Sequence, residues 1–527
     1  MKNKDIDKDL YLKSKMHSIL EGMGYLCKIK YDSPERILKD KATKKDLLEL
    51  DGAYYDVASQ CMIYFEATTQ GQDLSQKVIL KHNQLCLHTE EVEYNLGLFS
   101  KVEKRRFIFL SNKKPQGKDL EKLDSMVKVI YVDSNELEYY YIYLFEKIGK
   151  YLKYEFNKLL DISQKEKPRM ISAIKINMSG KTIYLFELSV DEVLKTSYVV
   201  RKKDLLDGGY QRILDDKKLK EINNFLEKGQ SYSIFPNSIL LNLNNKIIEI
   251  GNTNDDNIIQ LKFPIDSGLY HIIDGQHRVY GYCKSSIPLD QARLIIAGLQ
   301  NSTPDEERRF FLKINKTQKK IDPTLLNLLL AQTNFIDDED EYWESIASKL
   351  VLEMDKEGIY KNKIYKGAYL ERKKKDQKAT LSYMVDKIKK TKLLAHRKKE
   401  KGQIIIKDGL LQKKGEKDLS KPLKKLGTIT EEIIKNSEED PEIRNFFSSN
   451  RGFDLICRLV KGYFKLKKKN KKFNLSFEEY TQKLFFSKEI IIKFKSLYGT
   501  GGMVKISELT QKELNKVKAL KNLKLTN

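Results

Sequence analysis

The sequence predicts a multidomain chain of mixed α/β and α+β structure, on three observations. Its 527 residues exceed what one compact hydrophobic core usually serves. Hydrophobic residues make up 40% of the chain and aromatic residues 10%, which is enough to bury several cores. Strand and helix patterns alternate over residues 1–160 and 170–330, whereas residues 331–527 are predicted to be mainly helical and basic. We therefore expect three domains over these ranges.

The first domain is predicted to begin with an amphipathic helix over residues 5–25, because Leu10, Met16, Ile19 and Leu20 recur near one face. Gly22 and Gly24 are expected to end it. The other elements expected here are strands at 46–56, 61–70, 105–112 and 127–133, and helices at 74–92 and 136–156. A polar, charged segment, residues 164–169, is the expected linker to the second domain.

The second domain is predicted to mix strands with helices. Its expected helices lie at 215–229, 303–317 and 323–332. Its expected strands lie at 173–178, 181–189, 238–244, 247–251, 270–274 and 293–299.

Positive charge is concentrated in the last third of the chain. The formal net charge is +24, and residues 361–425 hold 23 Lys and Arg against 7 Asp and Glu. Residues 461–472 add seven lysines and no acid. Such clustering is typical of a surface that binds nucleic-acid phosphates, although a lysine-rich solvated surface gives the same pattern. The expected DNA contacts are Arg372, Lys373, Lys374, Lys375, Lys467, Lys468 and Lys469.

Composition also limits location and redox chemistry. No apolar run approaches the ~18 residues of a membrane span, and the amino-terminal segment lacks the apolar centre of a signal peptide, so we expect a cytoplasmic protein. The five cysteines are widely scattered and form no CxxC pair. This spacing disfavours a disulfide framework and a zinc site.

Two acids on adjacent predicted strands, Asp51 and Glu66, form the first candidate site. Carboxylates so placed can hold a divalent cation through oxygen ligands. The helix, strand, strand order with this pair resembles the PD-(D/E)xK nuclease superfamily, whose motif ends in a lysine two residues after the second acid. Here that position holds Thr68, which cannot supply a positive charge.

The threonine leaves several interpretations open. Lys77 or Lys81 from the following helix could replace the missing lysine, Gln70 could substitute weakly, or the domain could bind without cutting. Alternatively, Asp51 only opens a turn with Gly52, and Glu66 is a surface acid at a strand end.

The stretch HIIDGQHRVYGY, residues 271–282, forms the second candidate site. Apolar residues suit the end of a buried strand, Asp274 and Gly275 a tight turn, and the residues after it the start of a helix. Arg278 can grip phosphate oxygens, Asp274 can bind Mg²⁺, and His277 can act as an acid or cap the turn. The alternative is an internal Asp274–Arg278 ion pair with His277 bonded to backbone.

Three stretches together, residues 208–226, 271–281 and 308–326, resemble the DGQHR-domain family, which includes DndB of the DNA phosphorothioation systems. The resemblance covers about residues 170–420. This region is also remotely similar to the ParB/sulfiredoxin group. It implies a nucleotide or phosphate site with Mg²⁺ and a nucleoside triphosphate as cofactors. The implied site residues are Asp274, Gly275, Gln276, His277 and Arg278, with Tyr210, Gln211, Arg212, Asn315, Thr317 and Gln318 around them.

Two functions therefore stay open. One is an enzyme of a bacterial modification, restriction or phage-defence system, a nucleoside triphosphatase or a Mg²⁺-dependent nuclease that tracks DNA along its basic region. The other is a DndB-like regulator that binds DNA and breaks no bond. DNA and other components of such a system are the expected partners.

Overall fold

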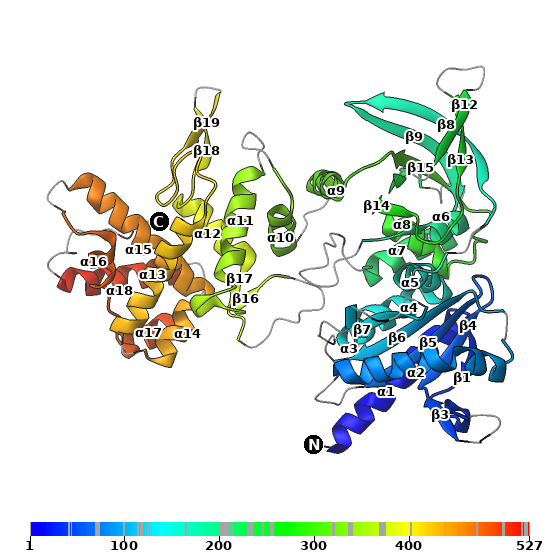
Figure 1. Ribbon diagram of the computed structural model, residues 1–527. Coiled ribbons are helices and arrows are strands. Elements are labelled where there is room, and N and C mark those ends of the chain that lie inside the picture. The colour runs from blue at the N-terminus through cyan, green and yellow to red at the C-terminus, as the bar shows by residue number, and fades with distance from the viewer. Residues whose placement is uncertain are drawn as a thin grey trace. The chain divides into compact units, whose positions relative to one another are not determined.

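The computed structural model describes most of the chain (Figure 1). The segments outside the described residues are 1, 40–42, 44, 69–73, 99–100, 113–114, 116–119, 122, 124–125, 164–165, 201–210, 212–213, 229–234, 245–246, 253–257, 319–321, 336–340, 368–375, 401–402, 438, 471–472, 498–500, 518–519, 521–524 and 526–527.

The chain forms two compact units, Met1–Glu307 and Arg308–Asn527. The boundary falls inside helix α9 (Pro304–Gln318). Helices and several sheets are both present, so the predicted mixed α/β character is confirmed. The three predicted domain ranges stay a prediction.

The first unit begins with a five-stranded sheet of order β1-β4-β5-β6-β7. Its first three strands are antiparallel neighbours, whereas β5, β6 and β7 run parallel. Two long helices accompany it, α1 (Lys2–Gly22) and α2 (Leu74–Asn95). The strands are β1 (Leu26–Ile29), β4 (Gly52–Asp56), β5 (Cys61–Thr68), β6 (Lys104–Ser111) and β7 (Lys128–Asp133).

The two helices cover opposite faces of this sheet. Tyr55 and Tyr64 share a core with Val78 and Leu85 of α2. Tyr54, the neighbour of Tyr55, therefore points to the other face, because side chains alternate along a strand. There it is bonded to His17 of α1. Coverage on both sides explains why every residue of β5 is buried.

Two predicted elements are divided in the structure. The predicted strand 46–56 is interrupted at Leu50 and Asp51, so that β3 (Asp46–Glu49) pairs with β2 (Ile37–Lys39) and β4 joins the main sheet. The predicted helix 136–156 is interrupted at Gly149, whose φ of 57° does not continue a helix. It divides into α4 (Ile142–Ile148) and α5 (Leu152–Leu160), with non-α-helical turns before and between them.

An eight-stranded mixed sheet forms the rest of the first unit, in the order β10-β14-β11-β15-β9-β8-β13-β12. Short helix α8 (Gln276–Gly281) follows β14 directly and packs against α7 (Asp216–Glu227). The strands are β8 (Arg169–Met178), β9 (Lys181–Ser189), β10 (Ser197–Tyr198), β11 (Ile239–Asn242), β12 (Ile248–Asn252), β13 (Ile258–Phe263), β14 (Tyr270–Asp274) and β15 (Arg293–Leu299).

Helix α5 is bonded to both parts of the first unit. Lys153 pairs with Asp56 of β4 at 2.7 Å. Asn157 accepts from the Tyr25 hydroxyl at 2.6 Å, and Tyr280 of α8 donates to Glu155. The five-stranded and eight-stranded sheets therefore share one connecting helix.

The second unit is largely helical. Its longest described helices include α11 (Tyr342–Met354), α12 (Leu381–Thr391), α13 (Ser420–Asn436), α15 (Asn450–Lys469) and α18 (Gly502–Lys516). A hairpin of β18 (His396–Glu400) and β19 (Gln403–Lys407) projects from it (Figure 1). Within the described part of the chain, no helix combines the length and apolarity needed to cross a membrane.

We expect Gly281→Ala to loosen the contact between α7 and α8. A Cβ at Gly281 would overlap Ile222 of α7, whereas one at Gly251 would meet nothing within 4 Å, and neither glycine has a positive φ. Overpacking of this kind costs about 1–3 kcal/mol. Hydrogen exchange should therefore quicken in α7 and α8 of Gly281→Ala, while Gly251→Ala keeps the parent pattern there. Equal protection in all three proteins would contradict this packing.

Candidate functional sites

The two predicted acids lie side by side in the five-stranded sheet. Gly52 pairs with Phe65, so antiparallel register sets Asp51 opposite Glu66. Both side chains are buried, with 5% and 6% of their residues' surface exposed. One Asp51 oxygen accepts from the Ala67 backbone N–H at 2.8 Å, which ties the two strands together beside the pair.

Three lysines surround this pair. Lys13 of α1 lies 2.7 Å from the other Asp51 oxygen. Lys77 and Lys81 of α2 lie 3.6 and 3.7 Å from the two Glu66 oxygens. Lys81 also donates to the Glu49 carbonyl. We call Lys13, Asp51, Glu66, Lys77 and Lys81 the acid–lysine cluster.

The cluster has the electrostatics of a cation or phosphate site. Burial and the neighbouring Asp51 charge raise the pKa of Glu66 to about 7, against the opposing pull of the lysines. Oxygen donors of this kind suit Mg²⁺. Because the three lysines already compensate the two carboxylates, a divalent ion would bind here by displacing ammonium groups from them.

Position 68 carries no charge, whereas two lysines of α2 lie close to Glu66. Thr68 is a buried residue at the end of β5 and brings no charge. Lys77 and Lys81, one helical turn apart, bring two ammonium groups to Glu66 instead. Gln70 lies outside the described residues.

The DGQHR stretch forms the strand, turn and helix that its residues predict. Strand β14 ends at Asp274, and α8 begins at Gln276. Gly275 between them has a φ of 101°. A Cβ there would lie 2.6 Å from Ile239, so both the backbone conformation and the space require glycine.

The charged side chains of this turn are bonded within the fold. Arg278 donates to the Asn237 and Ser238 carbonyls at 2.5 and 3.0 Å, and to Asp274 at 3.0 Å. Burial lowers the pKa of Arg278, while Asp274 opposes that shift. Arg278 therefore clamps β14 and α8 onto the segment that precedes β11.

His277 also has a backbone partner. Its Nε2 accepts from the Asp215 N–H at 2.9 Å, and Asp215 caps α7 by accepting from the Lys217 and Lys218 N–H groups. Gln276 is buried. These contacts match the alternative in which Asp274 and Arg278 form an internal ion pair and His277 bonds to backbone. Binding of a phosphate or metal at this turn stays a prediction.

The residues expected around the turn are partly described. Gln211 is buried and donates to the Ile272 carbonyl of β14. Asn315 donates to the Phe311 carbonyl of its own helix at 2.8 Å. Tyr210, Arg212 and the side chains of Thr317 and Gln318 lie outside the described residues.

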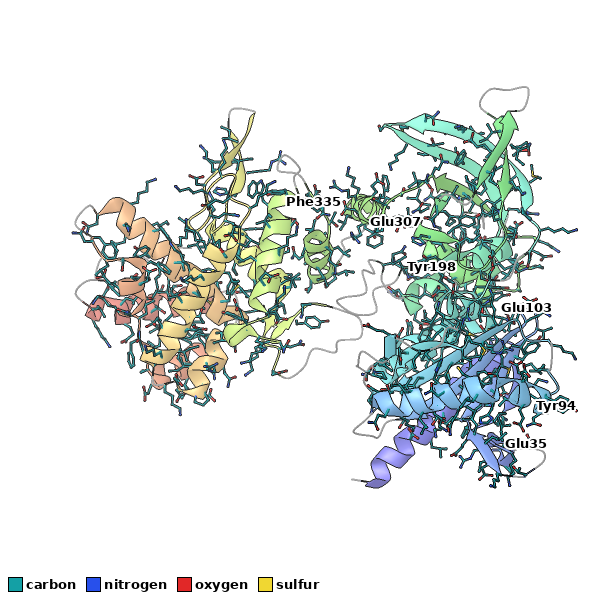
Figure 2. The ribbon with its side chains drawn as sticks, in the orientation of Figure 1. Glu35, Tyr94, Glu103, Tyr198, Glu307 and Phe335 are labelled. Atoms are coloured by element: carbon teal, nitrogen blue, oxygen red, sulfur yellow. The ribbon has the colours of Figure 1, made fainter. Side chains whose placement is uncertain are left out.

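A chain of polar groups near the start of β14 was not anticipated from the sequence. Tyr198 is bonded to His271 Nε2, and His271 Nδ1 lies 2.9 Å from Glu307 (labelled in Figure 2). Glu307 is 2% exposed and accepts from Asn242 at 2.5 Å. Only the presence of His271 beside the DGQHR residues could have signalled it, since its partners are distant in sequence.

Basic side chains gather on the second unit. Burial and the positive charges of Lys465, Arg458 and Lys392 lower the pKa of Lys461. Burial, Lys392 and Lys398 likewise lower the pKa of His396 at the base of the hairpin, against a backbone hydrogen bond. Lys392 is therefore close enough to both the hairpin and α15 to act on their charged groups. We call Lys392, Lys398, Lys461 and Lys465 the basic face.

Only part of the predicted DNA-contact set can be located. Lys467 and Lys468 are exposed near the end of α15. Lys467 donates to the Tyr463 hydroxyl at 3.3 Å. Arg372, Lys373, Lys374, Lys375 and the side chain of Lys469 lie outside the described residues.

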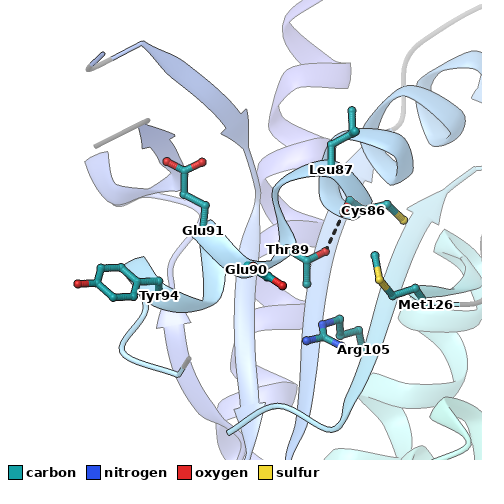
Figure 3. Close-up of a pocket in the computed structure, with 8 residues that line it drawn as sticks. All are labelled: Cys86, Leu87, Thr89, Glu90, Glu91, Tyr94, Arg105 and Met126. Atoms are coloured by element: carbon teal, nitrogen blue, oxygen red, sulfur yellow. Dashed lines mark hydrogen bonds between the residues drawn. The ribbon is translucent and has the colours of Figure 1, made fainter. Parts of the chain in front are cut away.

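A pocket of about 720 Å³ lies beside α2 and β6 (Figure 3). Its lining includes Arg105, which forms a bidentate pair with the buried Glu93 at 2.6 and 2.8 Å. The guanidinium is therefore already neutralised. Its other lining residues are Cys86, Leu87, Thr89, Glu90, Glu91, Tyr94 and Met126.

The central part of the chain matches a known protein family. Residues 171–391 match the family model of DndB, described as DNA-sulfur modification-associated. This region is similar to the DndB family, as the DGQHR resemblance implies. No curated protein and no solved structure matches the chain.

We expect Arg278→Ala to destabilise the first unit strongly. The change leaves two backbone carbonyls and Asp274 without their donor, at a cost on the order of 3 kcal/mol. Arg293→Ala is the control, because that side chain is half exposed and lies 3.9 Å from Glu192. Urea unfolding of the full chain measures both. A stable Arg278→Ala protein that has lost nucleotide binding would instead support a ligand role.

Proposed function

We propose that this chain is a DNA-binding component of a DNA-sulfur modification or defence system, and that its acid–lysine cluster binds and cleaves a phosphodiester with Mg²⁺. The observation that carries the proposal is the meeting of Asp51 and Glu66 with Lys77 and Lys81. The DndB-like match supplies the system. The resemblance to PD-(D/E)xK nucleases adds support through the strand order around the pair.

Each part of the cluster has a chemical role in this proposal. Asp51 and Glu66 would hold Mg²⁺, which supplies Lewis-acid activation of a phosphate oxygen when it is bound. Lys77 and Lys81 provide positive charge that attracts the phosphate and stabilises charge developing on it. Lys13 and the Ala67 N–H hold the Asp51 carboxylate in place.

The basic face supports DNA as the partner. Burial and the charges of Lys465, Arg458 and Lys392 lower the pKa of Lys461, which means that positive charge is crowded there. Phosphates relieve such crowding and release counterions on binding. In the hairpin, Arg397 pairs with Ile406 and Lys398 with Ile405. Strand β18 therefore carries the basic residues, and β19 carries the apolar residues opposite them.

The second candidate function is a DndB-like regulator that binds DNA without cutting. The absence of a lysine at position 68 and the internal bonds of Arg278 and His277 favour it. Nucleotide binding at the DGQHR turn would require Arg278 to exchange backbone carbonyls for phosphate oxygens. The proposal above does not depend on that exchange.

For cleavage, we expect Glu66→Gln to lower the rate of plasmid nicking with Mg²⁺ or Mn²⁺ by about 100-fold or more, because a neutral amide holds the ion weakly. Lys81→Ala should lower it by roughly 10–100-fold. Asp46→Asn is the control, since this acid is largely exposed and lies on the separate β2–β3 hairpin.

Two results decide between the candidates. Nicking by the parent that survives both cluster substitutions would place the activity elsewhere. DNA binding by the parent without any nicking in either metal would leave the regulator as the function.

For DNA affinity, we expect a triple alanine variant at Lys392, Lys461 and Lys465 to bind duplex DNA more weakly and with a flatter salt dependence. Each lost phosphate contact should reduce the slope of log K against log salt by about 0.9. The matched control replaces Lys356, Lys488 and Lys516, which each lie within 3.3 Å of an acid. Fluorescence anisotropy over a salt series measures the slopes. Identical slopes for the two triple variants would exclude the basic face.

A further inference from the structure

Three metal-ligand side chains meet on the sheet face that α1 covers, away from the α2 face. His17 and Glu21 lie one turn apart on α1, and Cys27 lies on β1. One ligand atom from each, the His nitrogen, a carboxylate oxygen and the Cys sulfur, lies within 4.8 Å of the others. His17 is buried, Cys27 half-buried and Glu21 exposed, so the cluster opens towards solvent.

The second ring nitrogen of His17 is bonded to an oxygen, as is usual for a histidine that binds a metal. Its Nδ1 lies 2.5 Å from the hydroxyl of Tyr54, a fully buried residue of β4. Metal-bound histidines commonly donate their second ring N–H to an oxygen, which fixes the ring and leaves the other nitrogen for the metal. Here that other nitrogen is Nε2.

His17 Nε2 faces a carboxylate, because the Glu21 Oε2 atom lies 2.9 Å from it. A lone pair and a carboxylate at that separation repel unless a proton or a cation lies between them. The Cys27 thiol, 3.6 Å from the Ile29 carbonyl, completes the third side.

We propose that His17, Glu21 and Cys27 bind one zinc ion through Nε2, a carboxylate oxygen and the thiolate, with water in a fourth position. Nitrogen, oxygen and sulfur donors together select Zn²⁺ over Mg²⁺, which prefers oxygen alone. Binding releases the Cys27 thiol proton to solvent, because the ligand is the thiolate. The site is separate from the acid–lysine cluster and does not rest on its proposed activity.

The zinc site would fasten α1 to the sheet. Its ligands join the helix to β1, and the Tyr54 hydroxyl extends the connection to β4. Lys13, which pairs with Asp51, lies one turn before His17 on the same helix. The ion would therefore hold the segment of α1 that carries Lys13.

The experiment uses the full chain, reduced and stripped of metal, and titrates it first with Co²⁺ and then with Zn²⁺. Co²⁺ bound by Cys27 gives a thiolate-to-cobalt band in the near ultraviolet, which Zn²⁺ then removes by displacement. We expect one such site per chain, resistant to excess Mg²⁺. The variants are Cys27→Ser, His17→Gln and Glu21→Gln, with Cys283→Ser as the matched cysteine control.

The expected results separate ligands from bystanders. Cys27→Ser should lose the band and Cys283→Ser should keep it. Glu21→Gln should weaken Zn²⁺ binding on the order of tenfold or more without unfolding, because Glu21 is exposed. Tyr54→Phe should weaken it by roughly 10–100-fold through loss of the hydrogen bond to the ligand histidine.

Two outcomes would overturn the site. One is a parent protein that takes up neither metal more tightly than Cys27→Ser. The other is a thiolate band that survives in Cys27→Ser. If Cys27→Ser or His17→Gln does not fold, Glu21→Gln decides alone, since a parent-like Zn²⁺ affinity in that variant would contradict the proposal.

Discussion

Two carboxylates buried on adjacent strands set the main electrostatic constraint of the amino-terminal sheet. Asp51 and Glu66 repel each other, and each has lost most of its water. Ammonium groups from α1 and α2 supply the compensating charge. An uncompensated buried charge would cost several kcal/mol, so the position of both helices is tied to this pair.

This arrangement resembles a prepared site more than a stabilising device. Buried ion pairs often contribute little net stability, because desolvation offsets their attraction. An apolar pair at these two positions would join the strands at a smaller electrostatic cost. The ligand proposed above, by exchanging with Lys77 and Lys81, would give the two acids a role beyond joining the strands.

The sequence located the acids and the strand, turn and helix of the DGQHR stretch, because these features follow from local residue types. Lys77 and Lys81 were among the predicted replacements for the missing lysine, since a helix after β5 returns along the sheet. Their geometry at Glu66 agrees with that alternative. The Asp274–Arg278 pair was among the predicted alternatives, and it is present. The backbone partners of Arg278 and the Glu307 partner of His271 were not predictable, because they lie at least 36 residues away. The interruption at Gly149 was missed because the apolar pattern continues across it.

Helix α5 has a mechanical consequence for the first unit. Its Lys153 is bonded to the five-stranded sheet, its Asn157 to Tyr25 just before β1, and its Glu155 to the helix after β14. Asn157 also reaches Ser267, just before β14, at 3.5 Å. If a protease cut the chain between α5 and β8, the hydrogen bonds of α5 to Tyr280 and Ser267 would still connect the two fragments.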